Sequence, residues 1–143
     1  MSDSQTKSTQ ASASRPRPLS PHLQVYRLPL AALTSITHRA TGVALSVGAV
    51  VLVAWLFAAA SSAECFNWLQ ATLKSPIGLF CMAGWSFALF YHLSAGIRHL
   101  IWDAGVGLDK QSVNTSNIIV IVCALALTGA AWFMVLPKLN LAI

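Results

Sequence analysis

Three long apolar stretches decide what this chain can fold into. They cover approximately residues 30–60, 77–101 and 117–136, and each reaches the ~20 residues that a helix needs to cross the hydrocarbon core of a bilayer. Only 9% of the 143 residues are charged, whereas a typical soluble domain has ~25%. Backbone polar groups in lipid must be bonded within the protein, so each stretch is predicted to be a helix. The sequence therefore predicts an all-α transmembrane protein with a three-helix domain over residues 30–136.

The segments outside the spans are short. Residues 1–14 are rich in Ser, Thr, Gln and Ala, and we expect a disordered N-terminal arm there. Residues 15–29 contain four prolines, which favour an extended chain, and their apolar side chains favour contact with a soluble partner subunit or with the membrane interface. We expect a mildly amphipathic connection at the membrane surface over 61–76, a polar loop over 105–116 and a short C-terminal tail over 137–143.

Positively charged residues gather on one side of the predicted membrane. They precede or enter the first span, or flank the second connection: Arg15, Arg17, Arg27, Arg39, Arg98 and Lys110. Loops rich in Lys and Arg stay in the cytoplasm, so the N-terminus is predicted to be cytoplasmic, and charges at membrane boundaries do not indicate a nucleic-acid site. The arm carries Asp3 and a single lysine before Arg15, unlike an arginine-rich mitochondrial transit peptide. This favours a multi-pass protein of the bacterial inner membrane over the mitochondrial inner membrane.

The second span contains a histidine far from water. At ~1.5 Å per residue, His92 lies roughly 15 Å below Trp102, where the apolar run ends. Ionisable residues at such depth are costly and are functional-site candidates. The side chains of Ala88, Ala95 and Gly96 on the same helix face are small. They either leave a recess beside His92 that suits a flat macrocycle, or they let a neighbouring helix approach closely.

A second polar group lies at the cytoplasmic end of the first span. The first apolar stretch is longer than a bilayer core at helical rise, so Ser35, His38 and Arg39 are expected in an overhang on that side. The second span returns to the same side, which brings Arg98 and His99 into the same layer. Arg39 would serve equally well as an ordinary topology anchor. The sequence thus predicts one polar region, with a deep imidazole below several cations.

Haem b fits this arrangement. Its iron takes a neutral imidazole nitrogen on each side, and its propionates need cations near the interface. His92 is the candidate axial ligand, and hence the candidate metal ligand, for the haem iron. Candidates for the propionates or their neighbourhood are His38, Arg39, Arg98 and His99. His99 lies ~10 Å from His92 along the same helix face, so the second axial ligand must come from another chain or from His38.

A quinone fits the shallower part of the polar region. Its carbonyl oxygens need hydroxyl or cationic donors at a place that both lipid and protons reach. Ser35 and Arg39 provide such donors and are the candidate quinone-binding residues. Neither pattern is specific by itself, because a haem-free structural anchor would also explain a packed His92.

Three segments of the chain together resemble one known family. They are RPLSPHLQVYR at 17–27, SITHRATG at 35–42 and HLSAGIRHLIWD at 92–103. In this order they resemble the cytochrome b membrane-anchor subunit of succinate dehydrogenase, the succinate:quinone oxidoreductase of respiratory complex II. The resemblance extends from Arg15 through the third span.

The resemblance implies roles for individual residues. By motif, Ser35 and Arg39 correspond to residues that border the ubiquinone site, and His92 corresponds to a haem b axial ligand. His38 corresponds to a propionate neighbour, and His99 matches the last histidine of the motif. Succinate chemistry belongs to another subunit of the family's complex, so no catalytic residue for it is expected in this chain.

The resemblance also implies partners and an activity. A second small anchor subunit would supply the opposite axial histidine for one shared haem b and complete a helical bundle with this three-helix anchor. An iron–sulfur subunit would pass electrons to ubiquinone, the substrate, and a flavoprotein subunit would oxidise succinate in the tricarboxylic acid cycle. The expected function is to help bind haem b and to form part of the ubiquinone-reduction site of the respiratory chain. The alternatives are a haem-free structural anchor and a subunit of a quinol:fumarate reductase.

Overall fold

Four helices make up the part of the chain that the structure describes, which is residues 27–140 of this computed structural model. They are α1 (Leu30–Ser61), α2 (Ala63–Lys74), α3 (Pro76–Asp103) and α4 (Lys110–Asn140). No strand occurs among these described residues. The predictions for residues 1–14 and for most of 15–29 lie outside the described part.

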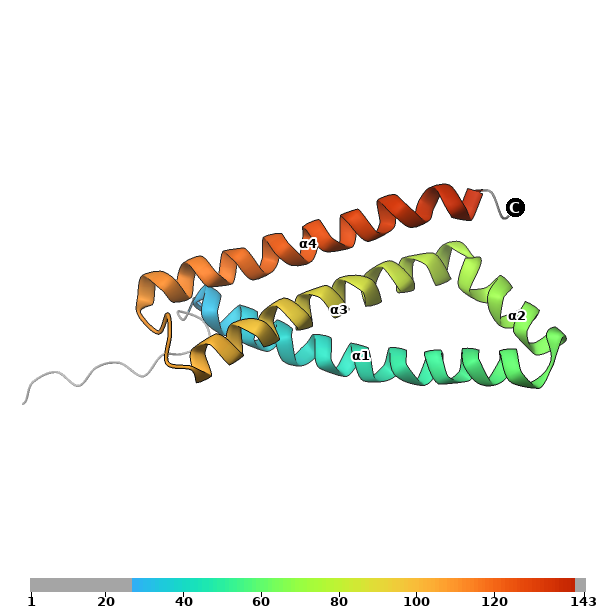
Figure 1. The fold of residues 1–143 in the computed structure, drawn as a ribbon, viewed down its shortest axis with the longest axis horizontal. Coiled ribbons are helices and arrows are strands. Elements are labelled where there is room, and N and C mark those ends of the chain that lie inside the picture. Colours follow the sequence, from blue (N-terminus) through green and yellow to red (C-terminus); the bar gives the residue numbers. More distant parts are fainter. Residues whose placement is uncertain (1–26, 141–143) are drawn as a thin grey trace, which may run out of the picture.

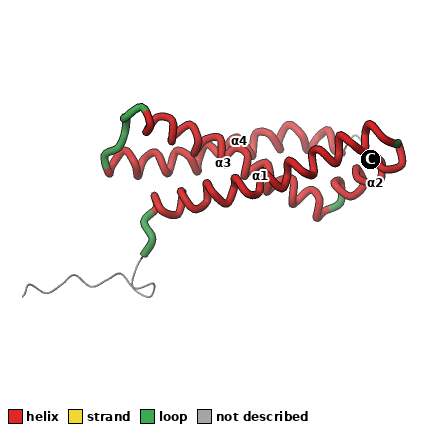
Figure 2. The backbone as a smooth tube through the Cα atoms, turned by 90° about the horizontal axis from the view of Figure 1, so that it is seen from below, coloured by secondary structure: helices red, strands yellow, loops and turns green. Residues whose placement is uncertain are grey.

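Three of the four helices are long and apolar enough to cross a membrane. They are Leu30–Ser61, Pro76–Asp103 and Lys110–Lys138 within α4, which confirms the all-α prediction with three spans. In Figure 1, α1 and α3 cross near the beginning of α1 and spread apart toward the end that α2 bridges, while α4 follows α3. Figure 2 shows the same three long helices from below, with the short α2 at the far end.

The connection between the first two spans is itself a helix, which the sequence analysis did not predict. Two serines set its limits. The hydroxyl of Ser62 accepts a hydrogen bond from the Cys65 backbone N–H at 3.2 Å and caps α2, and the hydroxyl of Ser75 accepts one from Gly78 N–H at 3.1 Å and caps α3. Pro76 suits the first turn of α3, because that turn needs no N–H from it.

The last helix begins seven residues earlier than the apolar run at 117–136 suggests. α4 starts at Lys110, so the predicted polar loop over 105–116 shrinks to the turn between Asp103 and Lys110. Gly105 and Gly107 have φ angles of 77° and 73° in this turn, a region that glycine reaches without steric cost. Residues 110–116 were predicted to be a loop because they are polar. A helical turn that lies outside the lipid is equally polar, so composition does not distinguish the two. At its other end α4 continues through Pro137 into the predicted tail.

The early start of α4 gives a testable prediction about Asp109. Its Oδ2 accepts a hydrogen bond from Ser112 N–H at 2.9 Å, and hydrogen bonds from the Ser112 side chain and backbone lower the pKa of this carboxyl. A lowered pKa means that the cap contributes above the ordinary carboxyl pKa and is lost as the pH falls through the lowered value. We expect Asp109→Ala to speed amide exchange in the first turn of α4, and acid below the ordinary carboxyl pKa to lower the protection of this turn, relative to intrinsic exchange rates, in the wild type. Hydrogen–deuterium exchange of that peptide, with Asp109→Asn as the acceptor-retaining control, measures this; unchanged exchange in Asp109→Ala would contradict it.

The bundle holds together through a narrow core of small and medium side chains. Tyr91 and Ala95 of α3 and Val120 and Ala124 of α4 are 2%, 0%, 3% and 0% exposed and form one cluster. Small residues let helix backbones approach closely, which is the usual packing mode in a membrane. Many large apolar side chains on the outer faces are exposed instead. They suit lipid or a partner subunit rather than water.

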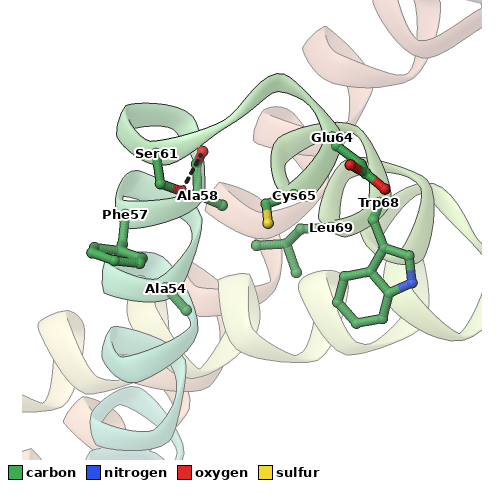
Figure 3. Close-up of a pocket in the computed structure, with 8 residues that line it drawn as sticks. All are labelled: Ala54, Phe57, Ala58, Ser61, Glu64, Cys65, Trp68 and Leu69. Carbon is green, nitrogen blue, oxygen red and sulfur yellow. Dashed lines mark hydrogen bonds between the residues drawn. The ribbon is translucent and has the colours of Figure 1, made fainter.

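Two cavities lie toward the α2 end of the molecule. The cavity in the corner between α1 and α2 has a volume of about 440 Å³, and Figure 3 shows that its lining combines apolar side chains with Ser61, Glu64 and Cys65. A larger, partly open cavity of about 910 Å³ is lined by α1, α2 and α3 and includes Trp85 in its lining. None of the predicted site residues lines either cavity.

Candidate functional site

Three histidines from two helices stack at the crossing of α1 and α3. The ring of His38 lies between the rings of His92 and His99, with centroid distances of 4.2 Å and 4.9 Å and interplanar angles of 33° and 31°. We call these three residues the histidine stack. His92 and His99 are two helical turns apart on one face of α3, and α1 places His38 against that face. All three side chains are partly buried.

The surroundings of His92 determine which of its nitrogens carries the proton. Its Nδ1 lies 3.1 Å from the backbone carbonyl oxygen of His38 and 3.3 Å from the hydroxyl of Thr41. The Thr41 hydroxyl donates its own proton to the same carbonyl at 2.8 Å. Both neighbours of Nδ1 therefore act as acceptors, and this favours the tautomer with the proton on Nδ1. Nε2 then keeps its lone pair and can bind a metal.

A glycine provides the space for this imidazole. A Cβ atom placed on Gly42 would lie 3.1 Å from Cε1 of His92, closer than ordinary van der Waals contact. Gly42 belongs to the stripe of α1 that also carries Ser35 and His38. The sequence pattern showed that these residues share a face, but it did not show that the face packs on His92.

The other two members of the histidine stack differ in their surroundings. Nδ1 of His99 lies 2.7 Å from the carbonyl oxygen of Ala95 in its own helix, and its ring lies 5.4 Å from the ring of Trp102. Nε2 of His38 is buried and has no hydrogen-bond partner among the described residues. His99 is thus held by α3 itself, whereas His38 keeps one nitrogen available inside the stack.

Ser35 and Arg39 lie beside the histidine stack on α1, one turn apart. Ser35 is partly buried and Arg39 is exposed. Residues four apart lie on the same face of a helix. The Ser35 hydroxyl and the Arg39 guanidinium therefore share one face of α1, with the hydroxyl nearer the interior of the bundle and the guanidinium at its surface. This arrangement could present two donors to one small acceptor.

The contacts of Arg98 are with residues outside the histidine stack. It is only 4% exposed, its Nη1 donates to the Oδ1 atom of Asn117, and its guanidinium carbon lies 4.5 Å from the centroid of the Trp102 ring. Asn117 is not among the predicted site residues, because an amide at the start of an apolar run resembles a simple span boundary. Neither is Thr34, whose hydroxyl donates to Oδ1 of Asn117 at 2.8 Å.

The small residues near His92 do not form the predicted recess together. Ala95 is fully buried in the cluster with Val120 and Ala124 of α4, so its size serves close helix packing, which is the second of the two interpretations given above. A Cβ atom on Gly96, in contrast, would meet nothing within 4 Å. Helical spacing identified which residues share a face with His92, but it could not show which neighbour covers each of them.

These features define a class of protein: a multi-pass helical membrane subunit with stacked imidazoles between two of its spans. The chain matches the family model described as succinate dehydrogenase/fumarate reductase transmembrane subunit over residues 13–131. It is 50% identical over 101 residues to the succinate dehydrogenase cytochrome b556 subunit of Paracoccus denitrificans, covering 71% of this chain and 78% of that protein. Over 116 residues it is 42% identical to the subunit of the same name from Rickettsia felis, covering 81% and 90%.

A more distant relative extends the same match. The succinate dehydrogenase cytochrome b560 subunit of Reclinomonas americana is 37% identical over 123 residues, covering 82% of this chain and 85% of that protein. The chain belongs to the succinate dehydrogenase/fumarate reductase transmembrane subunit family. The resemblance drawn from the three sequence motifs is thereby confirmed.

Proposed function

We propose that this chain helps bind haem b and forms part of a ubiquinone-reduction site in a succinate dehydrogenase complex. The observation that carries the proposal is the hydrogen bonding of His92. Its Nδ1 is held by the His38 carbonyl and the Thr41 hydroxyl, at 3.1 Å and 3.3 Å, which frees Nε2. Histidines that bind metals commonly donate their other ring N–H to a carbonyl in this way.

The donor set fits one haem shared with a second chain. His92 would supply one axial nitrogen. His38 is a poor candidate for a second ligand, because its ring lies against that of His92 at 4.2 Å between centroids, which leaves no room for a metal between the two imidazoles. The second axial histidine is therefore assigned to a second anchor subunit.

The remaining polar residues of this region would surround the propionates. Arg39 is the exposed cation, His38 has a buried nitrogen without a partner among the described residues, and His99 belongs to the same histidine stack. Arg98 keeps only a limited part of its guanidinium for such a contact, since its Nη1 is bonded to Asn117. Charge-assisted hydrogen bonds from such groups are the strong ones for a carboxylate.

Ser35 and Arg39 would act on ubiquinone. Both donate hydrogen bonds, so they can hold a carbonyl oxygen and stabilise the negative charge that develops there during reduction. Haem b held by His92 would supply one-electron redox chemistry to the complex. Arg39 is exposed on the surface of this chain, where a small molecule can reach it.

The family membership supports the remaining parts of the proposal. We assign an iron–sulfur subunit as the electron donor and a flavoprotein as the site of succinate oxidation, and place the N-terminus in the cytoplasm of a bacterium. In this assignment residues 15–29 contact the soluble subunits. This chain contributes no residue to succinate oxidation.

The purified complex tests this proposal. Succinate should reduce a b-type haem and then ubiquinone, with the haem seen as a reduced-minus-oxidised difference spectrum. A complex without haem but with normal ubiquinone reduction would indicate the structural anchor instead. Faster oxidation of menaquinol by fumarate than reduction of ubiquinone by succinate would indicate the quinol:fumarate reductase.

The close approach of Gly42 to His92 leads to a further prediction. Gly42→Ala adds a methyl group 3.1 Å from Cε1 of His92, so the imidazole must move by a few tenths of an ångström. We expect the complex to retain haem but to show shifted low-spin haem signals in electron paramagnetic resonance, because the hydrogen bonds to Nδ1 change. Gly129→Ala is the matched control, since its methyl meets nothing within 4 Å. Identical spectra for Gly42→Ala and the wild type would refute the proposed contact.

A further inference from the structure

Polar side chains from three helices meet in the interior next to the histidine stack. Thr34 of α1, Arg98 of α3 and Asn117 of α4 are 2%, 4% and 0% exposed; we call them the polar clamp. In Figure 1 the beginning of α1, the end of α3 and the beginning of α4 gather at one end of the molecule, where these residues lie.

One oxygen atom joins the polar clamp. Oδ1 of Asn117 accepts a hydrogen bond from Nη1 of Arg98 and another from the Thr34 hydroxyl, the latter at 2.8 Å. Nη1 of Arg98 also lies 3.5 Å from the Thr34 oxygen. The backbone carbonyl of Thr34 in turn accepts a hydrogen bond from the Tyr91 hydroxyl at 3.1 Å. Thr34 is thus bonded to α4 through its side chain and to α3 through its backbone.

The chemistry of the polar clamp is not that of simple packing. It buries a cation whose partners within residues 27–140, namely Asn117, Thr34 and Trp102, are all neutral, and burial of a charge without a counter-charge is costly. It also contains more donors than acceptors. Nε of Arg98 and Nδ2 of Asn117 are buried without partners among the described residues.

We propose that Thr34, Arg98 and Asn117 are positioning residues for the quinone site, an inference that rests on the function proposed above. The polar clamp fixes the rotation of α1 about its axis at Thr34. Ser35 is the next residue and Arg39 lies five residues on, so their directions follow from that rotation at about 100° per residue. None of the three clamp residues needs to touch the quinone.

The same rotation reaches His92. The carbonyl of His38, one helical turn after Thr34, accepts the hydrogen bond from Nδ1 of His92 at 3.1 Å. A turn of α1 that moved Ser35 and Arg39 would therefore move this carbonyl as well. The hydrogen bonds of the polar clamp thus determine the positions of the Ser35 and Arg39 side chains and of the His92 imidazole together.

The experiment measures quinone kinetics in the complete complex. Thr34→Val removes the hydroxyl and keeps the shape of the side chain, and Asn117→Leu removes the shared oxygen. We expect kcat/KM for ubiquinone to fall about tenfold in each, because small misplacements of substrate-orienting groups have effects of this order or larger. Succinate oxidation with an artificial electron acceptor should be unchanged, which shows that the complex has assembled.

Conservative variants separate positioning from packing. Thr34→Ser keeps the hydroxyl, and Asn117→Asp keeps Oδ1 while replacing the unpartnered NH₂ by a second acceptor for Arg98. Both should retain most of the ubiquinone activity. Thr128→Val is the matched control, because the Thr128 hydroxyl donates to the Ala124 carbonyl of its own helix at 2.7 Å. It should not change the ubiquinone kinetics.

Two results would overturn the inference: wild-type ubiquinone kinetics in Thr34→Val and Asn117→Leu, or an equal loss in Asn117→Asp and Asn117→Leu. If Asn117→Leu does not assemble, the difference between Thr34→Val and Thr34→Ser decides. Arg39→Ala, measured in parallel, keeps the two proposals apart. A strong effect of Arg39→Ala without an effect of the clamp variants rejects only the polar clamp, whereas no effect of Arg39→Ala rejects the quinone site.

Discussion

Replacing His92 by alanine is expected to abolish the haem b absorbance of the assembled complex. The substitution removes Nε2, the nitrogen that the hydrogen bonds at Nδ1 leave free for iron. This nitrogen is the one proposed to hold the haem iron, and the remaining contacts of this chain would be to the propionates alone. The measurement is a reduced-minus-oxidised difference spectrum of the purified complex, normalised to the bound flavin.

Two controls strengthen this test. Exogenous imidazole added to His92→Ala should restore part of the haem signal, because the small molecule fits the space left by the side chain. Thr128→Val should retain the haem absorbance, since the Thr128 hydroxyl donates to the Ala124 carbonyl of its own helix at 2.7 Å, outside the histidine stack. An undiminished haem signal in His92→Ala, or a wild-type complex without haem, would remove the basis of the ligand assignment.

Replacing Arg39 by alanine is expected to lower ubiquinone reduction about a hundredfold, the effect typical of losing one donor that stabilises developing negative charge. Ser35→Ala should have a smaller effect, about tenfold, because a neutral hydroxyl forms the weaker hydrogen bond. Succinate oxidation with an artificial acceptor should remain unchanged in both. The readout is the ratio of the two activities in the same membranes.

The controls for Arg39 separate the quinone contact from topology. Lys110→Ala removes a positive charge from the beginning of α4 and should leave ubiquinone reduction intact. Arg39→Lys keeps the charge but loses the planar guanidinium, so it should recover only part of the activity. If both activities fall together in Arg39→Ala, the arginine supports assembly rather than quinone reduction.

The sequence could predict the three spans and one polar region with His38 and His99 in the same layer, but it placed His92 deeper than both. Hydropathy determines the depth of a residue in the membrane, and the helical period determines its face. Antiparallel neighbours then bring residues of equal depth together. Hydropathy and helical period could not predict that the ring of His38 stacks on that of His92, because this contact depends on how closely α1 and α3 approach at Gly42.

Other features depend on contacts that no periodicity reveals. The sequence left two interpretations of Ala95 open, and close helix packing is the one that holds, because α4 covers this residue. Asn117 looked like a boundary residue and is fully buried. The helical character of residues 110–116 and of α2 follows from caps at Asp109 and Ser62, and a cap is recognised with confidence only once the turn before it is known.

The hydrogen bond from His92 to the His38 carbonyl ties the imidazole to the backbone of the first span. That carbonyl belongs to the helix turn between Ser35 and Arg39 and is shared with the Thr41 hydroxyl. Electron donation by an imidazole rises with the strength of the bond at its other nitrogen. Any ligand that shifts this helix turn would therefore change the absorbance and the redox potential of a metal held by His92. Binding of a molecule at Ser35 and Arg39 would then be visible as a spectral change of that metal.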